Sequence, residues 1–204
     1  MSIKLNCSNL TLFRGERCLF KELEFALNPG ELLLLEGRNG SGKTSLLRAI
    51  AGLIELESGT ILWNDEPVNK ERQVFQNAMV WMSHKTGFKG DLTLVDNLRF
   101  EANLRLRSSR DFDEVLQKLG LSRLKRLPIR SLSAGQQRRV ALARMLLAAA
   151  PLWMMDEPAS NLDAQGRELV TKLLAEHLGK GGMAIVAAHQ DVVLDVPVHR
   201  IQLQ

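Results

Sequence analysis

The part of the chain best suited to chemistry runs from Gly37 to Thr44 and reads Gly-Arg-Asn-Gly-Ser-Gly-Lys-Thr. It fits the pattern of a glycine, four residues and Gly-Lys-[Ser/Thr] that cradles polyphosphates. Glycines in such a loop let backbone N–H groups approach the phosphates with no Cβ atom in the way. Lys43 is expected to reach the β and γ phosphates, and the Thr44 hydroxyl to coordinate Mg²⁺. The residues expected to bind nucleotide here are Gly37, Arg38, Asn39, Gly40, Ser41, Gly42, Lys43, Thr44 and Ser45.

The segments on either side of this loop are the ones that the motif requires. Residues 31–36 form an apolar run bounded by glycines, which predicts a buried parallel strand. Residues 45–51 place apolar side chains at helical spacing up to Gly52, a suitable C-terminal cap. The positive end of that helix dipole would face the phosphates. A glycine-rich turn without a ligand would not need both flanks, so we interpret the loop as a phosphate site.

A second chemical element lies far along the chain, at Asp156 and Glu157. Residues 152–155 are a continuous apolar run that predicts a buried strand, and the two acids follow it directly. In phosphoryl transfer one carboxylate holds Mg²⁺ and another accepts the proton of the attacking water. We therefore expect Asp156 to serve the metal and Glu157 to act as the general base. Acids that only cap the next helix would not need to stand side by side after a buried strand.

Two histidines follow other predicted strands. His84 comes after the apolar residues 78–83, and His189 comes after the apolar residues 183–188. A residue at the carboxyl end of a parallel strand points into the ligand crevice of such a sheet. Both histidines are therefore site candidates, and we expect His189 to lie beside the phosphates.

The rest of the sequence predicts the strands and helices that hold the loop, the acids and the histidines in place. Residues 3–13 and 17–27 alternate apolar and polar side chains around a glycine turn, which predicts a two-stranded antiparallel ribbon. Residues 59–65 and 199–203 predict two further strands. Residues 85–131 read as a helical segment, with capped helix starts at 93–96 and 111–114 and a stop at Gly120. Ser133 and Gln136 fit the capping box of another helix.

Composition narrows the class of protein. The 204 residues are 45% hydrophobic and 25% charged, as in a globular domain with a proper core. No run approaches the ~20 apolar residues needed to cross a bilayer, and the N-terminus lacks a signal-peptide core, so we expect a cytoplasmic protein. Cys7 and Cys18 lack metal-ligand spacing and are expected to be reduced thiols.

The net charge says less than the composition about the class of protein and its partners. The net charge of +4 is spread along the chain rather than concentrated in one block, which favours a mildly basic surface over nucleic-acid binding. A smaller group of basic residues lies in the helical segment, where it forms either a solvated face or the contact for an acidic partner. Its members are Arg123, Lys125, Arg126 and Arg130.

Taken in order, the motifs resemble those of the ATP-binding cassette (ABC) ATPases over essentially the full length. A phosphate loop alone would fit kinases, GTPases and helicases as well. The ordered set is residues 37–44, Leu-Ser-Ala-Gly-Gln at 132–136, Asp156-Glu157, residues 160–163 and His189. The resemblance implies an α/β fold, with a P-loop NTPase (RecA-like) core, an N-terminal antiparallel β ribbon and an inserted α-helical subdomain. It implies one domain over residues 1–204, with core and β subdomain in 1–84 and 132–204 and the helical subdomain in 85–131.

The resemblance also implies roles for residues of this sequence. Residues 132–136 would be the signature sequence, with Ala134 where glycine is usual. Ser133 and Gly135, with Gln136 beside them, would contact the γ phosphate of ATP held by the opposite protomer. Asp163 would be the acid of the interface loop. The catalytic set would be Lys43, Glu157 and His189, in which His189 senses the γ phosphate, and Thr44 and Asp156 would serve Mg²⁺.

Two positions depart from the family pattern. Phe13 stands roughly where the family has a base-stacking aromatic, usually Tyr, and it is equally well explained as a core residue of the ribbon. His84 stands where the family usually has a Gln that ligates Mg²⁺ and couples ATP to the transmembrane partner. Because Mg²⁺ prefers oxygen ligands, we expect His84 to act through water or as a sensor of a partner.

The short length, His84 and the Leu-Ser-Ala-Gly-Gln signature together resemble the ATP-binding subunits of cytochrome c maturation haem exporters. This implies ATP and Mg²⁺ as cofactors, a homodimer in the ATP-bound state, and transmembrane partners of the kind named CcmB, CcmC and CcmD. It implies no nucleic acid, and a peripheral position on the cytoplasmic face of the bacterial inner membrane. The alternatives are an ABC transporter subunit for a lipoprotein or small solute, or a soluble ABC ATPase acting on nucleic acid.

Residues 85–104 are the expected docking surface for a membrane partner. This segment carries Phe88, Leu92, Leu94 and Phe100, with few apolar neighbours in the sequence to bury all four. Exposed apolar side chains often mark an interface. Packing within the helical segment is the alternative.

Overall fold

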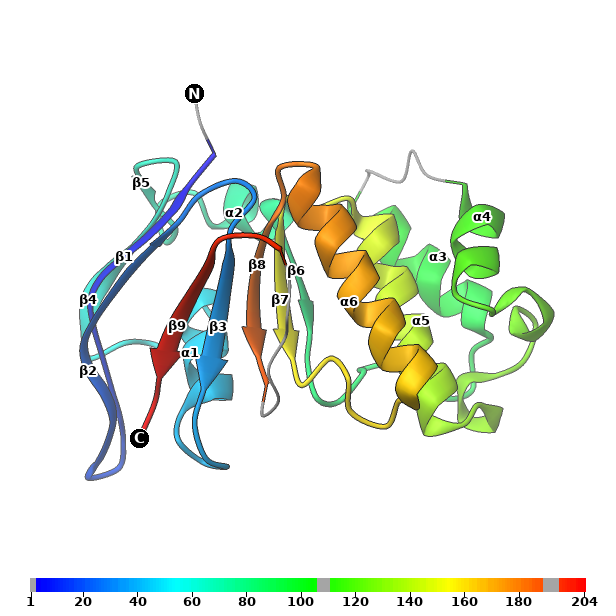
Figure 1. The fold of residues 1–204 in the computed structure, drawn as a ribbon, viewed down its shortest axis with the longest axis horizontal. Coiled ribbons are helices and arrows are strands. Elements are labelled where there is room, and N and C mark those ends of the chain that lie inside the picture. Colours follow the sequence, from blue (N-terminus) through cyan, green and yellow to red (C-terminus); the bar gives the residue numbers. More distant parts are fainter. Residues whose placement is uncertain (1–2, 106–110, 189–194) are drawn as a thin grey trace.

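The computed structural model describes residues 3–105, 111–188 and 195–204, and within these residues two sheets are formed (Figure 1). One is antiparallel with the order β2-β1-β4-β5, and the other is parallel with the order β6-β7-β8-β3-β9. The first contains β1 (Leu5–Arg14), β2 (Arg17–Leu27), β4 (Ser58–Trp63) and β5 (Glu66–Pro67). The second contains β3 (Leu32–Glu36), β6 (Met79–Met82), β7 (Leu152–Asp156), β8 (Met183–Ala187) and β9 (Val198–Gln202).

Helices cover the sheets and form the far end of the molecule (Figure 1). They are α1 (Lys43–Ile50), α2 (Arg72–Ala78), α3 (Leu94–Arg105), α4 (Phe112–Lys118), α5 (Ala134–Ala148) and α6 (Ala164–Gly179), with short 3₁₀ turns η1 (Ser122–Leu124) and η2 (Ile129–Ser131). In the part of the chain that the structure describes, no helix is long and apolar enough to cross a membrane. The helix starts expected near residues 93, 111 and 133 are confirmed: Thr93 and Asp111 accept hydrogen bonds from the backbone ahead of them, and Ser133 closes a capping box with Gln136.

The antiparallel sheet is wider than the sequence predicted. Strands β1 and β2 form the expected ribbon, and β4 pairs with the other edge of β1. Asn64 and Asp65 both have positive φ, at 55° and 67°, which allows a two-residue hairpin into β5. The sequence had indicated the strand at β4 and its turn, but not the neighbour that it would pair with.

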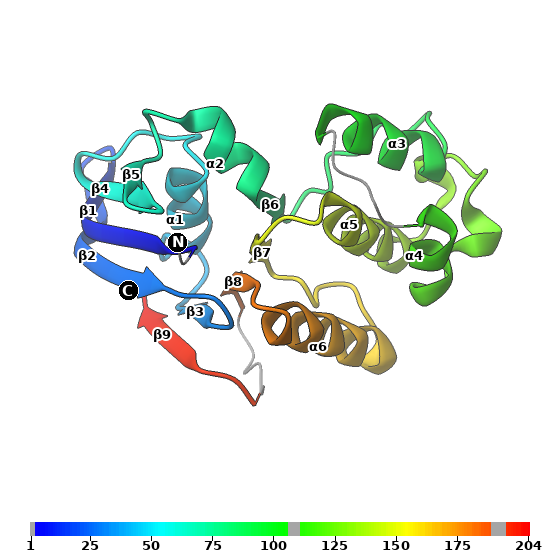
Figure 2. The same cartoon turned by 90° about the horizontal axis from the view of Figure 1, so that it is seen from above.

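Each strand of the parallel sheet serves two hydrophobic cores, because successive side chains point to opposite faces. Leu33 and Leu35 of β3 pack with α1 and the antiparallel sheet, whereas Leu32 and Leu34 pack in the core that contains α5 and α6. Viewed from above, the sheet separates these two layers (Figure 2). Burial on both faces explains why these strands read as continuous apolar runs.

The apolar side chains expected to form a docking surface divide into two groups. Leu94 is fully buried in the core shared with α5, and Phe88 packs against that core with the Arg144 guanidinium 5.1 Å from its ring centroid. Leu92 and Phe100 remain 37% and 50% exposed. Internal packing therefore accounts for half of the group.

Gly37 directly follows β3 and has a backbone conformation that side-chain-bearing residues rarely adopt. Its φ is 141°, and a Cβ atom there would clash with the Leu203 carbonyl and lie 2.6 Å from the Ser41 hydroxyl oxygen. Gly15 also has a positive φ, at 62°, but nothing lies within 4 Å of its added Cβ. We expect Gly37→Ala to lower the free energy of unfolding by about 2–5 kcal/mol, against about 1–2 kcal/mol for Gly15→Ala, since only the first adds a steric clash to backbone strain. Denaturant unfolding of both variants measures this, and equal losses would contradict it.

Candidate active site

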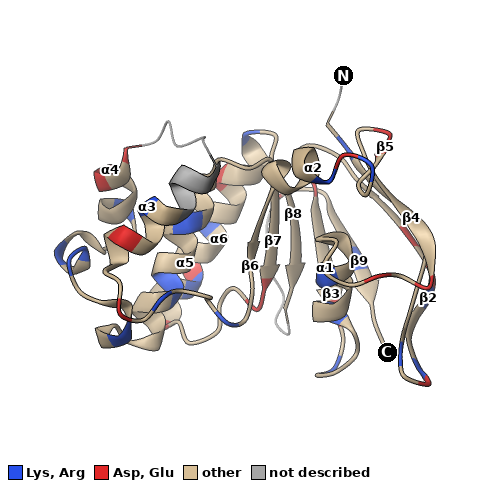
Figure 3. Cartoon of the chain, turned by 180° about the vertical axis from the view of Figure 1, so that it is seen from behind, with Lys and Arg blue, Asp and Glu red and all other residues tan. Residues whose placement is uncertain are grey.

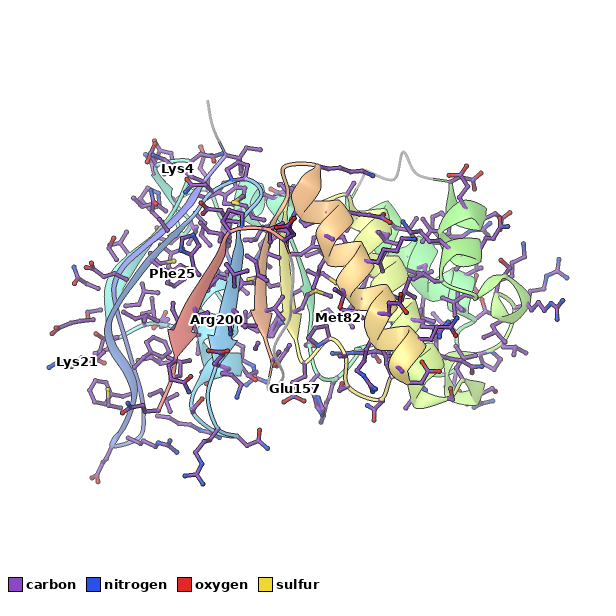
Figure 4. The ribbon with its side chains drawn as sticks, in the orientation of Figure 1. Lys4, Lys21, Phe25, Met82, Glu157 and Arg200 are labelled. Carbon is purple, nitrogen blue, oxygen red and sulfur yellow. The ribbon has the colours of Figure 1, made fainter. Side chains whose placement is uncertain are left out.

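The order of the parallel strands brings the predicted chemistry to one edge. Strands β3 and β7 are separated only by β8, so the loop after Glu36 and the acids after Met155 emerge side by side. Figure 4 places Glu157 just beyond the carboxyl ends of the parallel strands. A pocket of about 530 Å³ lies there. It is lined by Asn39, Gly40, Thr44, Arg48, Trp81, Ser83, His84, Lys85, Asp156 and Glu157.

The loop itself has the geometry of an anion cradle. Gly37, Gly40 and Gly42 all have positive φ, at 141°, 81° and 108°. Gly42 is the N-cap of α1 and supplies no side-chain cap, so no side chain at that position competes for the first amides of the helix. The Ser41 hydroxyl is buried and has no hydrogen-bond partner among the described residues. Polar donors gathered at a helix N-terminus fit a phosphate group.

Lys43 lies across the loop that precedes it. Its ammonium group donates to the carbonyl oxygens of Gly37, at 2.6 Å, and Arg38, at 3.1 Å, and the residue is only 6% exposed. A lysine has three donors, so these bonds hold the charge in place and leave one donor for a ligand. Arg38, Asn39 and Gly40 are exposed along the same loop.

A direct contact joins the two halves of the site. The Thr44 hydroxyl donates a hydrogen bond of 2.8 Å to the carboxylate of Asp156, which lies 112 residues further along the chain and is 3% exposed. In an octahedral site with ligands at about 2.1 Å, neighbouring ligand oxygens lie about 3 Å apart. The two oxygens therefore have the chemistry and the spacing of a pair beside Mg²⁺, either directly or through water.

Glu157 stands at the rim of the pocket in an unusual backbone conformation. Its φ is 50°, and its N–H donates to the carbonyl of Ala187 on β8, which fixes the backbone although the residue is not glycine. The side chain is one third exposed, and one carboxylate oxygen lies 4.0 Å from the Nδ1 atom of His84. The structure thus brings His84 to the predicted acids. His189 lies outside the described residues.

Arg138 was not identified from the sequence, and it binds the backbone of the segments that carry His84 and Glu157. Its guanidinium is buried, at 2% exposure, and donates to the carbonyls of Asp156, Glu157, Pro158 and Ser83. Burial lowers its pKa to about 10, so it stays charged at neutral pH. The available signal was spacing, because Arg138 shares a helix face with the buried residues Ala141, Leu142 and Met145.

Ser133, Gly135 and Gln136 of the Leu-Ser-Ala-Gly-Gln segment line a second pocket of about 390 Å³. There the Ser133 hydroxyl accepts from the Gln136 N–H, and the Gln136 side chain accepts from the Ser133 N–H. Gly135 lies against the Asn161 carbonyl, 3.1 Å from where a Cβ would stand. Asp163 caps α6 by accepting from the Gly166 N–H at 2.7 Å. Neither Lys43 nor Asp156 lines this pocket.

Phe13 is not placed as a core residue. It lies near the hairpin turn of β1, is 44% exposed and does not line the pocket at the loop. The residues of β2 that approach the loop are Leu19 and Phe20, which face Gly42.

The basic side chains of the helical segment, residues 85–131, are partly paired: Lys125 forms an ion pair with Asp113, and Arg130 forms one with Asp91. Figure 3 shows Lys and Arg interspersed with Asp and Glu.

Proteins of similar sequence belong to a family of ATP-binding proteins, which agrees with the phosphate-binding geometry of the loop. A family profile described as ABC transporter matches residues 20–160. The chain belongs to the ATP-binding proteins of ABC transporters, so it binds ATP and is the ATPase subunit of such a transporter. It is similar to the cytochrome c biogenesis ATP-binding export protein CcmA of Vibrio parahaemolyticus, at 45% identity over 195 residues and 95% of each chain. The CcmA protein of Nitrosomonas europaea is 42% identical over 205 residues, which cover 98% of this chain and 95% of that relative.

Solved structures share the fold. A putative ABC transporter ATP-binding protein from Pyrococcus furiosus has a TM-score of 0.84 at 23% identity, with 98% of this chain and 97% of that chain covered. A dimeric ATP-binding cassette in a post-hydrolysis state, bound to ADP and phosphate, has a TM-score of 0.80 at 24% identity, with 91% and 88% covered. The predicted combination of a parallel core sheet and an N-terminal antiparallel sheet is confirmed.

Proposed function

We propose that this ATPase works with Mg²⁺ at the pocket beside Thr44 and Asp156, and that its transporter handles haem during the biogenesis of c-type cytochromes. The observation that carries the catalytic part is the 2.8 Å hydrogen bond from Thr44 to Asp156, with Glu157 next in the chain. The observation that supports the biological part is the similarity to CcmA proteins over nearly the whole chain.

The loop residues bind and orient the polyphosphate. The N–H groups of the glycine loop and of the first turn of α1 surround the phosphates, and Lys43 places a fixed positive charge beside them. Thr44 and Asp156 would hold Mg²⁺, which when bound neutralises charge on the β and γ phosphate oxygens. The Ser41 hydroxyl, buried without a described partner, gains a phosphate oxygen or a bound water as its acceptor.

Glu157 then serves as the general base. Its carboxylate lies at the rim of the pocket, where a water in line with the γ phosphate would donate a proton to it. His84 stands 4.0 Å away and orients that carboxylate, or reports its state to a partner bound nearby. His189 is proposed to sense the γ phosphate because the family resemblance implies this role.

A second copy of the chain completes each site. The pocket that contains Ser133, Gly135 and Asp163 is separate from the one that contains Thr44 and Asp156, so these groups serve different nucleotides if both sets contact ATP. The dimeric cassette of similar fold supports a homodimer, and the family resemblance implies that its interface holds two ATP. The helical unit, residues 85–131, would carry the signature segment of one protomer toward the ATP of the other.

We assign the ATPase to the cytoplasmic face of the bacterial inner membrane, held there by transmembrane subunits of the CcmB, CcmC and CcmD kind. Leu92 and Phe100 are the exposed apolar side chains of the predicted docking segment. The competing function is an ATPase subunit for another substrate, such as a lipoprotein or a small solute. The CcmA relatives favour the haem assignment.

The catalytic assignment is tested by Glu157→Gln, which keeps the shape of the side chain and removes the proton acceptor. We expect the rate of ATP hydrolysis to fall by ~10²- to 10⁴-fold. ATP affinity should be unchanged, and the variant should accumulate as an ATP-bound dimer on size-exclusion chromatography. Adding Ser133→Arg should abolish that dimer, because its charge and bulk enter the second pocket. Near-normal turnover in Glu157→Gln would rule out this base.

The biological assignment is tested by deleting the gene in a host that has c-type cytochromes and no second maturation system. We expect covalently haem-bearing c-type cytochromes to disappear from haem-stained gels while b-type cytochromes remain. Restoring the gene with Lys43→Ala should not rescue them, since the loop loses its fixed charge. Normal c-type cytochromes in the deletion strain would leave the competing transporter function.

A further inference from the structure

Arg138 links two segments of the active site that come from different strands. It lies on α5 and donates to the Asp156 carbonyl at 2.7 Å and, through Nε, to the Pro158 carbonyl at 3.1 Å. The Glu157 carbonyl also accepts from it. Its other terminal nitrogen donates to the carbonyl of Ser83, at 3.0 Å, directly before His84. One side chain therefore holds the ends of both β6 and β7.

The chemistry of the side chain makes this link rigid. A guanidinium is planar and carries its donors in a fixed fork, so it sets both the spacing and the orientation of the carbonyls that it binds. Because Arg138 is only 2% exposed, water has little access to replace its hydrogen bonds to these carbonyls. A lysine at this position would keep the charge but has a single nitrogen, which cannot meet four carbonyls on two segments.

The position of Arg138 in its helix connects it to the second pocket. Ser133 caps α5, and Arg138 follows on the second turn of the same helix. A shift of this helix start therefore moves the guanidinium together with the carbonyls that it holds. Glu157 is sensitive to such a shift because its backbone has a φ of 50° and is also tied to Ala187.

We propose that Arg138 is a positioning residue that holds the backbone of the general base Glu157 in register with the His84 segment, and transmits the position of the signature helix to both. This inference rests on the proposed role of Glu157. It assigns Arg138 no contact with ATP, so its effect should appear in the hydrolysis step and not in nucleotide affinity.

A double-mutant cycle on the full chain tests this proposal. Arg138→Lys should reduce the single-turnover rate of ATP hydrolysis by ~10- to 100-fold, because small misplacements of a reacting group cost rates of this order. The affinity for a fluorescent ATP analogue should stay within error of the wild type. In the Glu157→Gln background, Arg138→Lys should cause no further loss, since the base that it positions is already gone.

Arg144→Lys is the matched control. Arg144 lies on the same helix and donates to the carbonyls of Thr86 and Trp81, which flank His84. Its variant should lower the unfolding midpoint about as much as Arg138→Lys while keeping the hydrolysis rate. If Arg138→Lys does not fold, Arg138→Gln, which retains an amide donor, takes its place in the cycle.

The outcomes separate this inference from the proposed function. An equal fold-loss from Arg138→Lys in both backgrounds, no loss in either, or a loss of nucleotide affinity would overturn the positioning role while Glu157 remains the base. Near-normal turnover in Glu157→Gln alone would remove the base, and the inference with it.

Discussion

The hydrogen bond between Thr44 and Asp156 is the contact on which the active site depends, since it joins residues 112 positions apart. The two residues can meet because β3 and β7 are parallel and separated only by β8, so that the loop of one strand and the acid of the other lie at the same edge of the sheet. A slip of one residue along β7 would turn Asp156 to the opposite face of the sheet. The buried apolar side chains on both faces of β7 fix that register.

The other residues of the site lie close to this contact, either next in the sequence or on an adjacent strand. Glu157 is the next residue, and it keeps a left-handed backbone because Ala187 and Arg138 both bind its peptide groups. His84 follows β6, the strand that pairs with β7, and its side chain approaches the Glu157 carboxylate. The signature segment lies apart, in its own pocket, yet the helix that it starts carries Arg138 back to the acids. The helix that begins at the proposed contact for a second protomer therefore also supports the acids of the proposed ATP site.

Most residues that gather in the candidate site could be predicted from the sequence because the signals that mark them are local. The three glycines of the loop, the capping box at Ser133 and the acids after an apolar strand each depend on a few neighbouring residues. Contacts between distant segments could not be predicted in the same way. The pairing of β4 with β1 and the burial of Arg138 depend on partners up to tens of residues away. The division of the docking segment into buried Leu94 and exposed Phe100 also needed the packing of α3 on α5.

The metal site at Thr44 and Asp156 is tested by the effect of Mg²⁺ on ATP affinity in Asp156→Asn, measured with and without a chelator. An amide keeps an acceptor for Thr44 but lacks the charge that holds the metal. We expect the wild type and Glu157→Gln to bind ATP more tightly with Mg²⁺, and Asp156→Asn to bind ATP equally well in both conditions. An undiminished Mg²⁺ effect in Asp156→Asn would contradict the metal site at Thr44 and Asp156.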